Sequence, residues 1–171
     1  MKPLTKAQRE AVVAIARKDP KLKGRLGTRG TVLFIHPNLT GRGKEHPGQA
    51  VVGIHDYRDG RSVVAVVDPE EKRVVGIEEL PVPLQLSDEE RDEASSLAAK
   101  DKRIVEFLAK RKLNPLTRLY FLPSGGEPGH RYAIVFARPD NSERRYAIVD
   151  LTARKVTDVL DHLATRGPRT V

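Results

Sequence analysis

The chain has 171 residues, of which 39% are hydrophobic and 32% are charged, and its formal net charge is +8 at pH 7. It contains no cysteine, which excludes a disulfide framework and a thiolate metal site. No apolar stretch approaches the roughly 20 residues that a membrane helix needs, and the start, MKPLTKAQRE, lacks the apolar core of a signal peptide. We therefore expect a cytoplasmic protein that does not enter a membrane.

The most informative pattern is an internal repeat. The run RSVVAVVDPEEKRVVGIEEL (61–80) returns near the end of the chain as RRYAIVDLTARKVTDVLDH (144–162). Leu4 and Leu86 are 82 positions apart, and so are Asp68 and Asp150. A register held over this length predicts a duplicated unit. We expect the first copy to span residues 1–85 and the second copy to span residues 86–171.

Each copy is predicted to open with a helix. A hydroxyl residue followed three positions later by Gln or Glu predicts a capping box, formed by Thr5 with Gln8 in the first copy and by Ser87 with Glu90 in the second. Because a proline disfavours the helical conformation of its predecessor, Pro20 should end the first helix. Apolar residues at helical spacing supply the buried stripes, which are Ala11, Val12 and Ile15 in the first copy and Ala94, Leu97 and Ala98 in the second.

Four strand-like runs follow the helices in each copy, and turn residues such as Asp59-Gly60 favour hairpins between them. The predicted strands are residues 31–36, 49–57, 62–68 and 73–79 in the first copy, and residues 117–122, 131–138, 144–150 and 155–160 in the second. A helix followed by antiparallel strands places the chain in the α+β class. We therefore predict two tandem repeats, each with a helix packed on a four-stranded antiparallel sheet.

One predicted strand has no polar face. Residues 63–67 read Val-Val-Ala-Val-Val, whereas a strand with one face in water should alternate apolar and polar residues. Both faces must therefore be covered. We expect the helix to cover one face, and the neighbouring copy, a second chain or another protein to cover the other. The candidate interface residues are Val63, Val64 and Val66.

Positive charge is concentrated before the first predicted strand. Residues 1–29 hold nine Lys and Arg residues against Glu10 and Asp19, so this segment carries +7 of the net charge of +8. Such a surface favours an anionic partner, which could be a nucleic acid, an acidic patch on a protein or a lipid surface. The other interpretation is a solvated helix face that only aids solubility. The candidate binding residues are Lys18, Lys21, Lys23 and Arg25.

The sequence gives little support for metal or phosphate chemistry. His36, His46 and His55 flank a glycine-rich segment, and imidazoles brought together there could bind copper or zinc. Their spacing is wide, so separate hairpin histidines are the preferred interpretation. Residues 40–44 (TGRGK) lack the full spacing of a phosphate-binding loop. We predict neither a metal site nor a cofactor.

The stretch RSVVAVVDPEEKRVVGIEELPVPLQLSDEERDEASSLAAKDKRIVEFLAKRKLNP (61–115) resembles the junction between the two small N-terminal domains, N2 and N3, of copper amine oxidases. In that family a hairpin ending in a V-x-x-x-E-L-P type segment leads into a capped helix. The later run YAIVDLTARKVTDVLD (146–161) is similar to the closing strands of the N3 domain. The resemblance covers nearly the whole chain and implies two cystatin-like domains, each a helix packed on a curved antiparallel sheet.

The catalytic motifs of copper amine oxidases are missing from this sequence. That family uses a tyrosine in a T-x-x-N-Y-D/E context, which becomes a quinone, and a His-x-His pair with a third histidine on copper. None of the four tyrosines, Tyr57, Tyr120, Tyr132 and Tyr146, follows an asparagine, and no His-x-His occurs. The resemblance therefore implies a module without the catalytic domain, and we do not expect an enzyme.

Three classes of function remain open from the sequence. The preferred class is a noncatalytic protein-binding or assembly module, accessory to a separate partner or enzyme, which docks onto a partner protein or onto a second copy of the chain. The second class is nucleic-acid or other anionic-partner binding through the basic first helix. The third is a small-ligand pocket or an enzyme site between helix and sheet.

Overall fold

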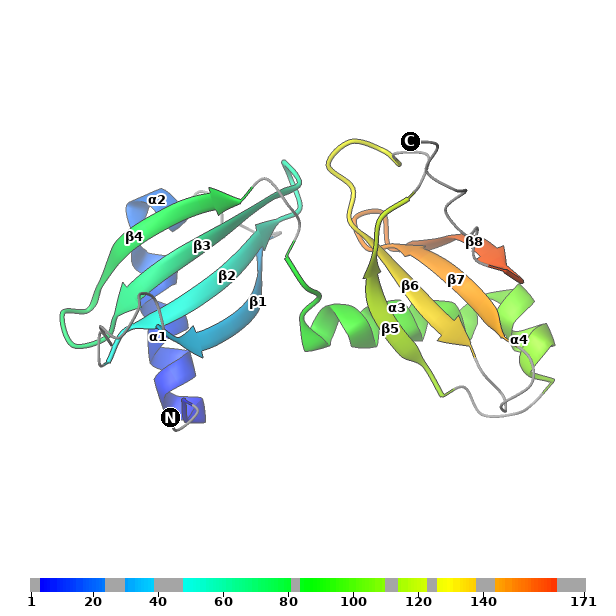
Figure 1. Cartoon of the computed structure of the whole chain (residues 1–171), viewed down its shortest axis with the longest axis horizontal. Helices are drawn as coiled ribbons and strands as arrows, with labels where there is room; N and C mark the ends of the chain where they lie inside the picture. Colours follow the sequence, from blue (N-terminus) through cyan, green and yellow to red (C-terminus); the bar gives the residue numbers. More distant parts are fainter. Residues whose placement is uncertain are drawn as a thin grey trace, which may run out of the picture. The chain divides into compact units, whose positions relative to one another are not determined.

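The computed structural model of the chain describes residues 4–23, 30–38, 48–80, 84–109, 114–122, 126–137 and 144–162. The chain divides into two compact units, Met1–Ser87 and Asp88–Val171. Each unit has its own helices and its own sheet, as Figure 1 shows. The two units are therefore described separately.

The first unit consists of a helical segment and a four-stranded sheet. Its elements are α1 (Lys6–Lys18), α2 (Pro20–Lys23), β1 (Gly30–Pro37), β2 (Ala50–Asp56), β3 (Arg61–Asp68) and β4 (Arg73–Leu80). The strands pair antiparallel in sequence order, so β1 and β4 are the edges of the sheet. In Figure 1, α1 crosses behind this sheet.

The start of α1 confirms the predicted capping box. The backbone N–H of Gln8 donates to the hydroxyl of Thr5 at 3.3 Å, and the backbone N–H of Thr5 donates to the side-chain oxygen of Gln8 at 2.8 Å. These two bonds satisfy N–H groups that have no partner inside the helix. The predicted apolar stripe needs one correction, because Ala11 is exposed and Ala16 is buried in its place beside Val12.

The core of the first unit lies between the helices and one face of the sheet. Alternate residues of β2 and β3 point to that face, since successive side chains of a strand point to opposite sides. Full burial of an aliphatic side chain contributes about 1.5–3 kcal/mol. The buried core residues are Val12, Ala16, Leu22, Ala50, Val52, Ile54, Val63, Ala65 and Val67.

The second unit repeats this order of elements. It consists of α3 (Asp88–Lys100), α4 (Lys102–Leu108), β5 (Leu116–Tyr120), β6 (Tyr132–Ala137), β7 (Arg145–Asp150) and β8 (Lys155–Leu160). The four strands again pair antiparallel in sequence order. Helix α3 contacts all four strands.

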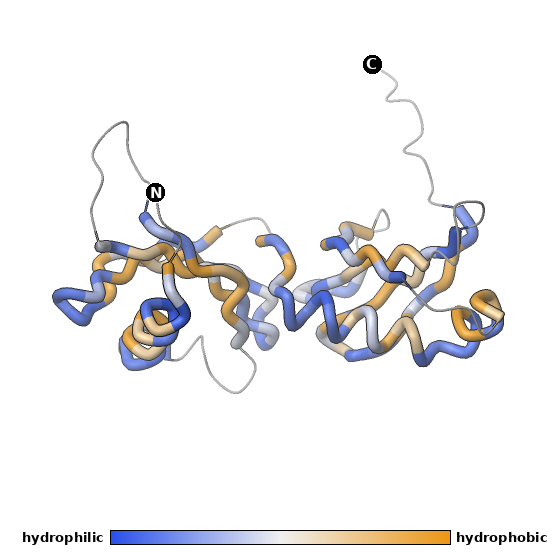
Figure 2. The backbone as a smooth tube through the Cα atoms, turned by 90° about the horizontal axis from the view of Figure 1, so that it is seen from below, coloured by the Kyte–Doolittle hydropathy of each residue, from blue (hydrophilic) through white to orange (hydrophobic). Residues whose placement is uncertain are grey.

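Both faces of the second sheet are apolar along its central strands. One set of alternating positions on β6 and β7 carries small buried side chains, namely Ala133, Val135, Ala137, Ala147 and Val149. The other set forms a cluster of Tyr132, Ile134 and Ile148, packed with Tyr120, Leu122, Phe136, Tyr146 and Leu160. Figure 2 shows the resulting hydrophobic colour along the strands and the hydrophilic colour at the hairpin ends.

Two details of the last hairpin of each unit recur in both copies. A register shift lies between Val66 and Val67 in β3 and between Ile148 and Val149 in β7. Lys72 and Arg154, which end the two hairpin turns, both have a left-handed backbone, with φ of 51° and 55°. These paired positions keep the spacing of 82 residues found in the sequence.

The strand-ending aspartates organise these turns. Asp68 accepts the N–H groups of Glu70 and Glu71, each at 3.0 Å, and Asp150 accepts the N–H of Ala153 at 2.8 Å. The backbone hydrogen bond from Glu71 is the main cause that lowers the pKa of Asp68.

The predicted fold class is confirmed: the chain is an α+β protein built from two tandem helix-plus-sheet repeats. No helix within the described ranges is long and apolar enough to cross a bilayer.

Candidate binding surface

The basic corner, which we define as Lys18, Lys21 and Lys23, lies where α1 meets α2. The Oδ1 atom of Asp19 accepts the N–H of Lys21 at 2.9 Å and the N–H of Leu22 at 3.3 Å, so Asp19 fixes the bend after α1. Leu22 then points into the core. This leaves the three lysines of the corner exposed. The fourth predicted residue, Arg25, lies outside the described residues.

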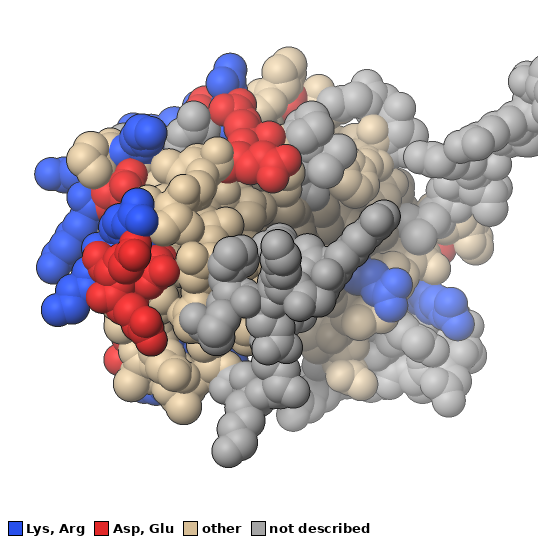
Figure 3. Space-filling model, turned by 60° about the vertical axis from the view of Figure 1, so that its left-hand side comes forward, with Lys and Arg blue, Asp and Glu red and all other residues tan. Residues whose placement is uncertain are grey.

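The lysines of the basic corner are not neutralised by the part of the unit that the structure describes. No carboxylate of the described residues lies within ion-pair distance of any of the three. Figure 3 shows Lys and Arg side chains gathered along one edge of the first unit, beside a group of Asp and Glu side chains and a broad uncharged area. The corner is therefore a surface with excess positive charge.

The equivalent corner of the second unit is built differently. Asp101 takes the place of Asp19, and Arg103 takes the place of Lys21. The guanidinium of Arg103 folds back onto Asp101, with Nε at 3.0 Å from Oδ1 and Nη2 at 2.8 Å from Oδ2. This hydrogen bond is the main cause that lowers the pKa of Asp101 and raises the pKa of Arg103. The charge of Arg103 is thus balanced within its own unit.

An open groove of about 360 Å³ lies between the basic corner and the edge strand β4. Asp19 and Lys21 line it from the helical side, and β4 lines it with Val74, Val75, Gly76 and Ile77. Val66 pairs with Gly76 and Val67 pairs with Val74, so Val75 is the extra residue of a β-bulge. Val75 is 38% exposed.

The three candidate interface valines lie on two different faces of β3. Val63 is buried in the core of the first unit, under α1. Val64 and Val66 point to the opposite face and are half-buried. The structure therefore removes Val63 from the set of residues that a partner could reach, while Val64 and Val66 stay candidates.

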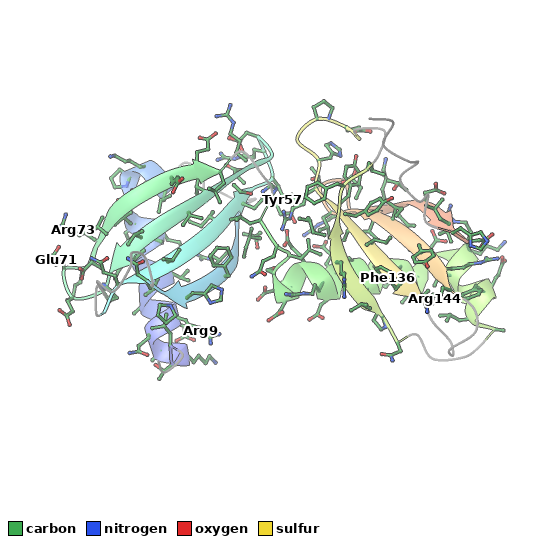
Figure 4. All side chains as sticks on the ribbon, in the orientation of Figure 1. Arg9, Tyr57, Glu71, Arg73, Phe136 and Arg144 are labelled. Carbon is green, nitrogen blue, oxygen red and sulfur yellow. The ribbon has the colours of Figure 1, made fainter. Side chains whose placement is uncertain are left out.

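The face of the first sheet that carries Val64 and Val66 also carries an aromatic side chain over a glycine. Phe34 on β1 pairs with Gly53 on β2, and a Cβ atom added to Gly53 would lie 2.3 Å from the Phe34 ring. Phe34 also stacks with the His36 ring, with ring centroids 5.0 Å apart. In the second unit the position of Gly53 is held by Phe136, which lies on β6 in Figure 4 and pairs with Leu116.

The candidate metal ligands do not come together in the described residues. His36 pairs with Val51 and His55 pairs with Thr31, so the two histidines lie at opposite ends of the β1–β2 pair. His36 is exposed, whereas His55 is buried and its Nδ1 lies 3.0 Å from the hydroxyl of Ser62. His46 lies outside the described residues. No group of three potential ligands capable of holding a metal occurs in the described part of the chain.

The second unit contains a buried ion pair that the sequence did not predict. Nε of Arg131 donates to Glu90 Oε1 at 2.7 Å, and Nη2 donates to Oε2 at 3.1 Å. Both residues are only 3% exposed. Glu90 was predicted from its local pattern as a capping residue of α3, and the structure adds a partner that is 41 positions away in the chain. A local pattern cannot identify such a partner.

A second polar contact holds the segment that precedes β6. The Nδ1 atom of His130 lies 2.6 Å from the buried carboxylate of Asp150, and its Nε2 atom lies 3.2 Å from Glu127. The hydroxyl of Tyr132 accepts the backbone N–H of Glu127 at 3.1 Å. Together these contacts fasten residues 127–130 to the β7–β8 turn. A histidine held between two carboxylates in this way supports a loop.

The geometry therefore offers a binding surface, made of the basic corner and the groove, more clearly than a reaction centre. No protein-family model matches the chain, and no curated protein sequence matches it significantly.

Proposed function

We propose that this chain is a noncatalytic binding module that docks onto an acidic partner protein through the basic corner. The observation that supports this most is the difference between the two copies. Lys18, Lys21 and Lys23 correspond to Lys100, Arg103 and Val105 of the second unit. The second unit forms the same fold with one of these charges paired and another replaced by valine. Folding therefore does not require three exposed lysines at this corner.

An acidic protein is favoured over a nucleic acid because of what surrounds the basic corner. Sequence-tolerant binding of single strands relies on aromatic rings for base stacking. The helical segments α1 and α2 contain no aromatic residue, and neither do the residues that line the adjoining groove, which are Asp19, Lys21, Val74, Val75, Gly76 and Ile77. Clustered lysines without aromatic neighbours suit a protein partner that presents carboxylates.

Two further parts of the proposal come from the sequence. The resemblance to the N2 and N3 domains of copper amine oxidases favours an accessory role beside a separate catalytic chain. The absence of cysteine favours a cytoplasmic location. Both parts would be tested by purifying the protein from its native host and identifying what is bound to it.

The docking proposal can be tested with two polyanions of different chemistry. The probes are poly-L-glutamate and a single-stranded oligothymidylate of matched charge, and binding is measured by isothermal titration calorimetry over a series of salt concentrations. We expect poly-L-glutamate to bind at low salt, and we expect the variant Lys18→Glu/Lys21→Glu/Lys23→Glu to lose at least about tenfold in affinity. The matched control, Lys100→Glu/Lys102→Glu/Lys155→Glu, changes the net charge equally in the second unit and should keep most of the affinity.

The outcome of this experiment decides between the classes. Oligothymidylate binding tighter than poly-L-glutamate, with the same lysine dependence, would show a nucleic-acid site. Equal losses in the two triple variants would show a response to net charge alone and would overturn the basic corner as a site. Lys21→Arg sharpens the result, because an arginine there can pair with Asp19 as Arg103 pairs with Asp101. We expect that variant to bind poly-L-glutamate more weakly although its charge is unchanged.

Self-association is a second candidate, favoured by the opposite charge of α3. The exposed acidic residues of α3 are Asp88 and Glu89 in its first turn and Asp92 one turn further. The acidic surface of one copy could meet the basic corner of another. Sedimentation velocity at low and high salt tests this: a dimer that forms only at low salt and is abolished by Asp88→Lys/Glu89→Lys would support it, and a monomer at low salt would exclude it.

A further inference from the structure

The edge strand β5 differs from the other three edge strands of the two sheets. Each of β1, β4 and β8 carries one extra residue that interrupts its pairing with the neighbouring strand, namely Leu33, Val75 and Thr157. Bulges of this kind twist an edge and hinder the addition of a further strand. Strand β5 has no bulge, because all of its residues pair one to one with β6. Among the described residues no strand pairs with the other side of β5, which Figure 1 shows at the edge of the second sheet.

Strand β5 is also weakly charged and apolar at its ends. It contains one charged residue, Arg118, whereas β4 contains three and β8 contains two. Only four large hydrophobic residues of the described part of the chain are exposed, and two of them belong here: Leu116, which begins β5, is 45% exposed, and Phe121, which follows it, is 62% exposed. The hydroxyl of Ser95 on α3 lies 2.8 Å from that of Thr117 and holds the strand in place. A regular edge with exposed apolar residues is a site for pairing with another chain.

We propose that β5 pairs antiparallel with β5 of another molecule of the same chain, with Leu119 on the twofold axis, so that two second-unit sheets join into one. The segment 116–122 is bounded by Pro115 and Pro123, which have no N–H to donate to a strand ladder. The two prolines are equally distant in sequence from Leu119, so this register pairs every residue between them. The inference goes beyond the proposed function and does not involve the basic corner.

The side chains of the segment are complementary to themselves in this register. Arg118 lies opposite Tyr120 of the other molecule, Leu116 lies opposite Leu122, and Thr117 lies opposite Phe121. The exposed residues Leu116 and Phe121 are thereby covered, and the guanidinium of Arg118 meets an aromatic ring, which is a favourable contact. The register centred on Arg118 would instead place two arginines directly opposite each other, which is unfavourable. Because one segment supplies both halves of each pair, another molecule of this chain is the occupant that fits the edge.

Sedimentation velocity of the full chain over a series of protein concentrations tests the pairing. We expect a monomer–dimer equilibrium whose dissociation constant changes by less than about threefold between low and high salt, because backbone hydrogen bonds and apolar contacts are little screened. The variant Leu116→Lys/Phe121→Lys should raise the dissociation constant at least about tenfold, since it puts charges at four cross-strand positions of the dimer. The matched control, Ala11→Lys/Val105→Lys, adds the same charge at two exposed helical positions and should leave the dimer unchanged.

Cysteine cross-linking tests the register, because the chain has no cysteine of its own. Opposite Cα atoms of antiparallel strands lie about 4.5–5.5 Å apart, which is within the range that a disulfide spans. The variant Leu119→Cys should therefore form a disulfide-linked dimer with diamide as the oxidant, seen on a non-reducing gel. Arg118→Cys should not, since its opposite residue is Tyr120, and Val105→Cys reports random collisions. Circular dichroism checks that each variant is folded.

Three outcomes would overturn the pairing of β5. The first is a monomer at every concentration, and the second is an equal loss of dimer in the two double-lysine variants. The third is cross-linking at Arg118→Cys in place of Leu119→Cys. A dimer that dissociates in high salt and is abolished by Lys18→Glu/Lys21→Glu/Lys23→Glu would also overturn it, in favour of association through the basic corner. Binding of poly-L-glutamate is a separate measurement, so the proposed function stands or falls independently.

Discussion

In both copies an aspartate follows the first helix at the bend, Asp19 in the first unit and Asp101 in the second. The basic residue two positions later, Lys21 or Arg103, makes different contacts in the two units. In the second unit the guanidinium and the backbone N–H of Arg103 both donate to Asp101. In the first unit Lys21 donates to Asp19 through its backbone N–H. Arginine has a planar fork that can grip a carboxylate at two points, and lysine has only a point charge on a flexible stem. The exchange of Lys21 for Arg103 is thus one of the differences between a corner closed by its own contacts and one whose charge remains available.

The copies also differ in how they begin their first helix. Gln8 in the first unit and Glu90 in the second occupy the same position of the repeat. Gln8 makes an exposed hydrogen bond with Thr5, while Glu90 pairs with Arg131 in the interior. A buried charge depends strongly on its partner, whereas an exposed cap contributes modestly. The stability of the second unit should therefore depend on this position more than that of the first.

The largest effect is expected for Arg131→Ala, which leaves the carboxylate of Glu90 buried without its ion-pair partner. We expect the free energy of unfolding of the second unit to fall by about 3–5 kcal/mol. The matched change in the first unit, Gln8→Ala, should cost only about 0.5–1 kcal/mol. Urea denaturation followed by circular dichroism measures both. Similar small losses in the two variants would contradict the difference drawn between the copies.

Replacing both Glu90 and Arg131 distinguishes the free energy lost by leaving one buried charge unpaired from the net contribution of the ion pair to stability. Replacing a buried ion pair by apolar residues of similar volume is often neutral or stabilising. The double variant Glu90→Leu/Arg131→Met should therefore recover most of the stability lost in Arg131→Ala. If the double variant is as unstable as Arg131→Ala, the loss of stability in Arg131→Ala does not come from the unpaired charge of Glu90.

A smaller effect is expected where the outer faces of the two sheets differ. Gly53→Ala places a Cβ against the Phe34 ring, and overpacking of this kind costs about 1–3 kcal/mol. Gly76→Ala is the control, because the added Cβ would make only an ordinary contact with Val66 at 4.0 Å and should change stability by less than about 0.5 kcal/mol. Thermal denaturation of both variants gives the comparison. Adding Phe34→Ala to Gly53→Ala should relieve the clash, and a further loss with no coupling would contradict it.

The smallest effect concerns the dependence of the second corner on pH. The hydrogen bond from Arg103 lowers the pKa of Asp101 below its ordinary value of 3.8. The ionised carboxylate of Asp101 therefore stabilises the folded state fully above pH 3.8, and this stabilisation is lost as the pH falls through the lowered pKa. Asp101→Asn should therefore lower stability at pH 7 by about 0.5–1 kcal/mol, and the difference from the unchanged protein should vanish in strong acid. Urea denaturation between pH 7 and acid measures this. Asp19→Asn is the control, and an equal pH-dependent loss there would erase the contrast between the corners.

The order of elements could be predicted because it depends on local patterns. Strand β8 has the predicted bounds, and the other strands differ from prediction by two residues or fewer at each end. The capping box at Thr5 is likewise a contact between residues three positions apart. The repeat strengthened each assignment, because the same pattern had to suit both copies.

The candidate site was only partly predictable from the sequence. The basic corner could be predicted from the density of positive charge in the sequence. The groove beside it exists because β4 is an edge strand with a bulge at Val75. Which strands pair, and in which register, cannot be read from either strand alone. The faces of Val63 and Val64 could not be assigned, since a run without polar residues has no alternation to read. The contact between His130 and Asp150 joins residues 20 positions apart. Such contacts become visible only when the sheet is assembled.

The different sizes on the outer faces have a consequence for how a duplicated chain folds. Two similar neighbouring copies can misfold by exchanging strands, a characteristic failure of repeat proteins. Here a β1 strand placed on β6 would set Phe34 against Phe136, and a β5 strand placed on β2 would set Leu116 over Gly53. We expect the first exchange to crowd two rings and the second to leave Gly53 without its covering ring, so these side-chain sizes favour pairing of each strand within its own copy.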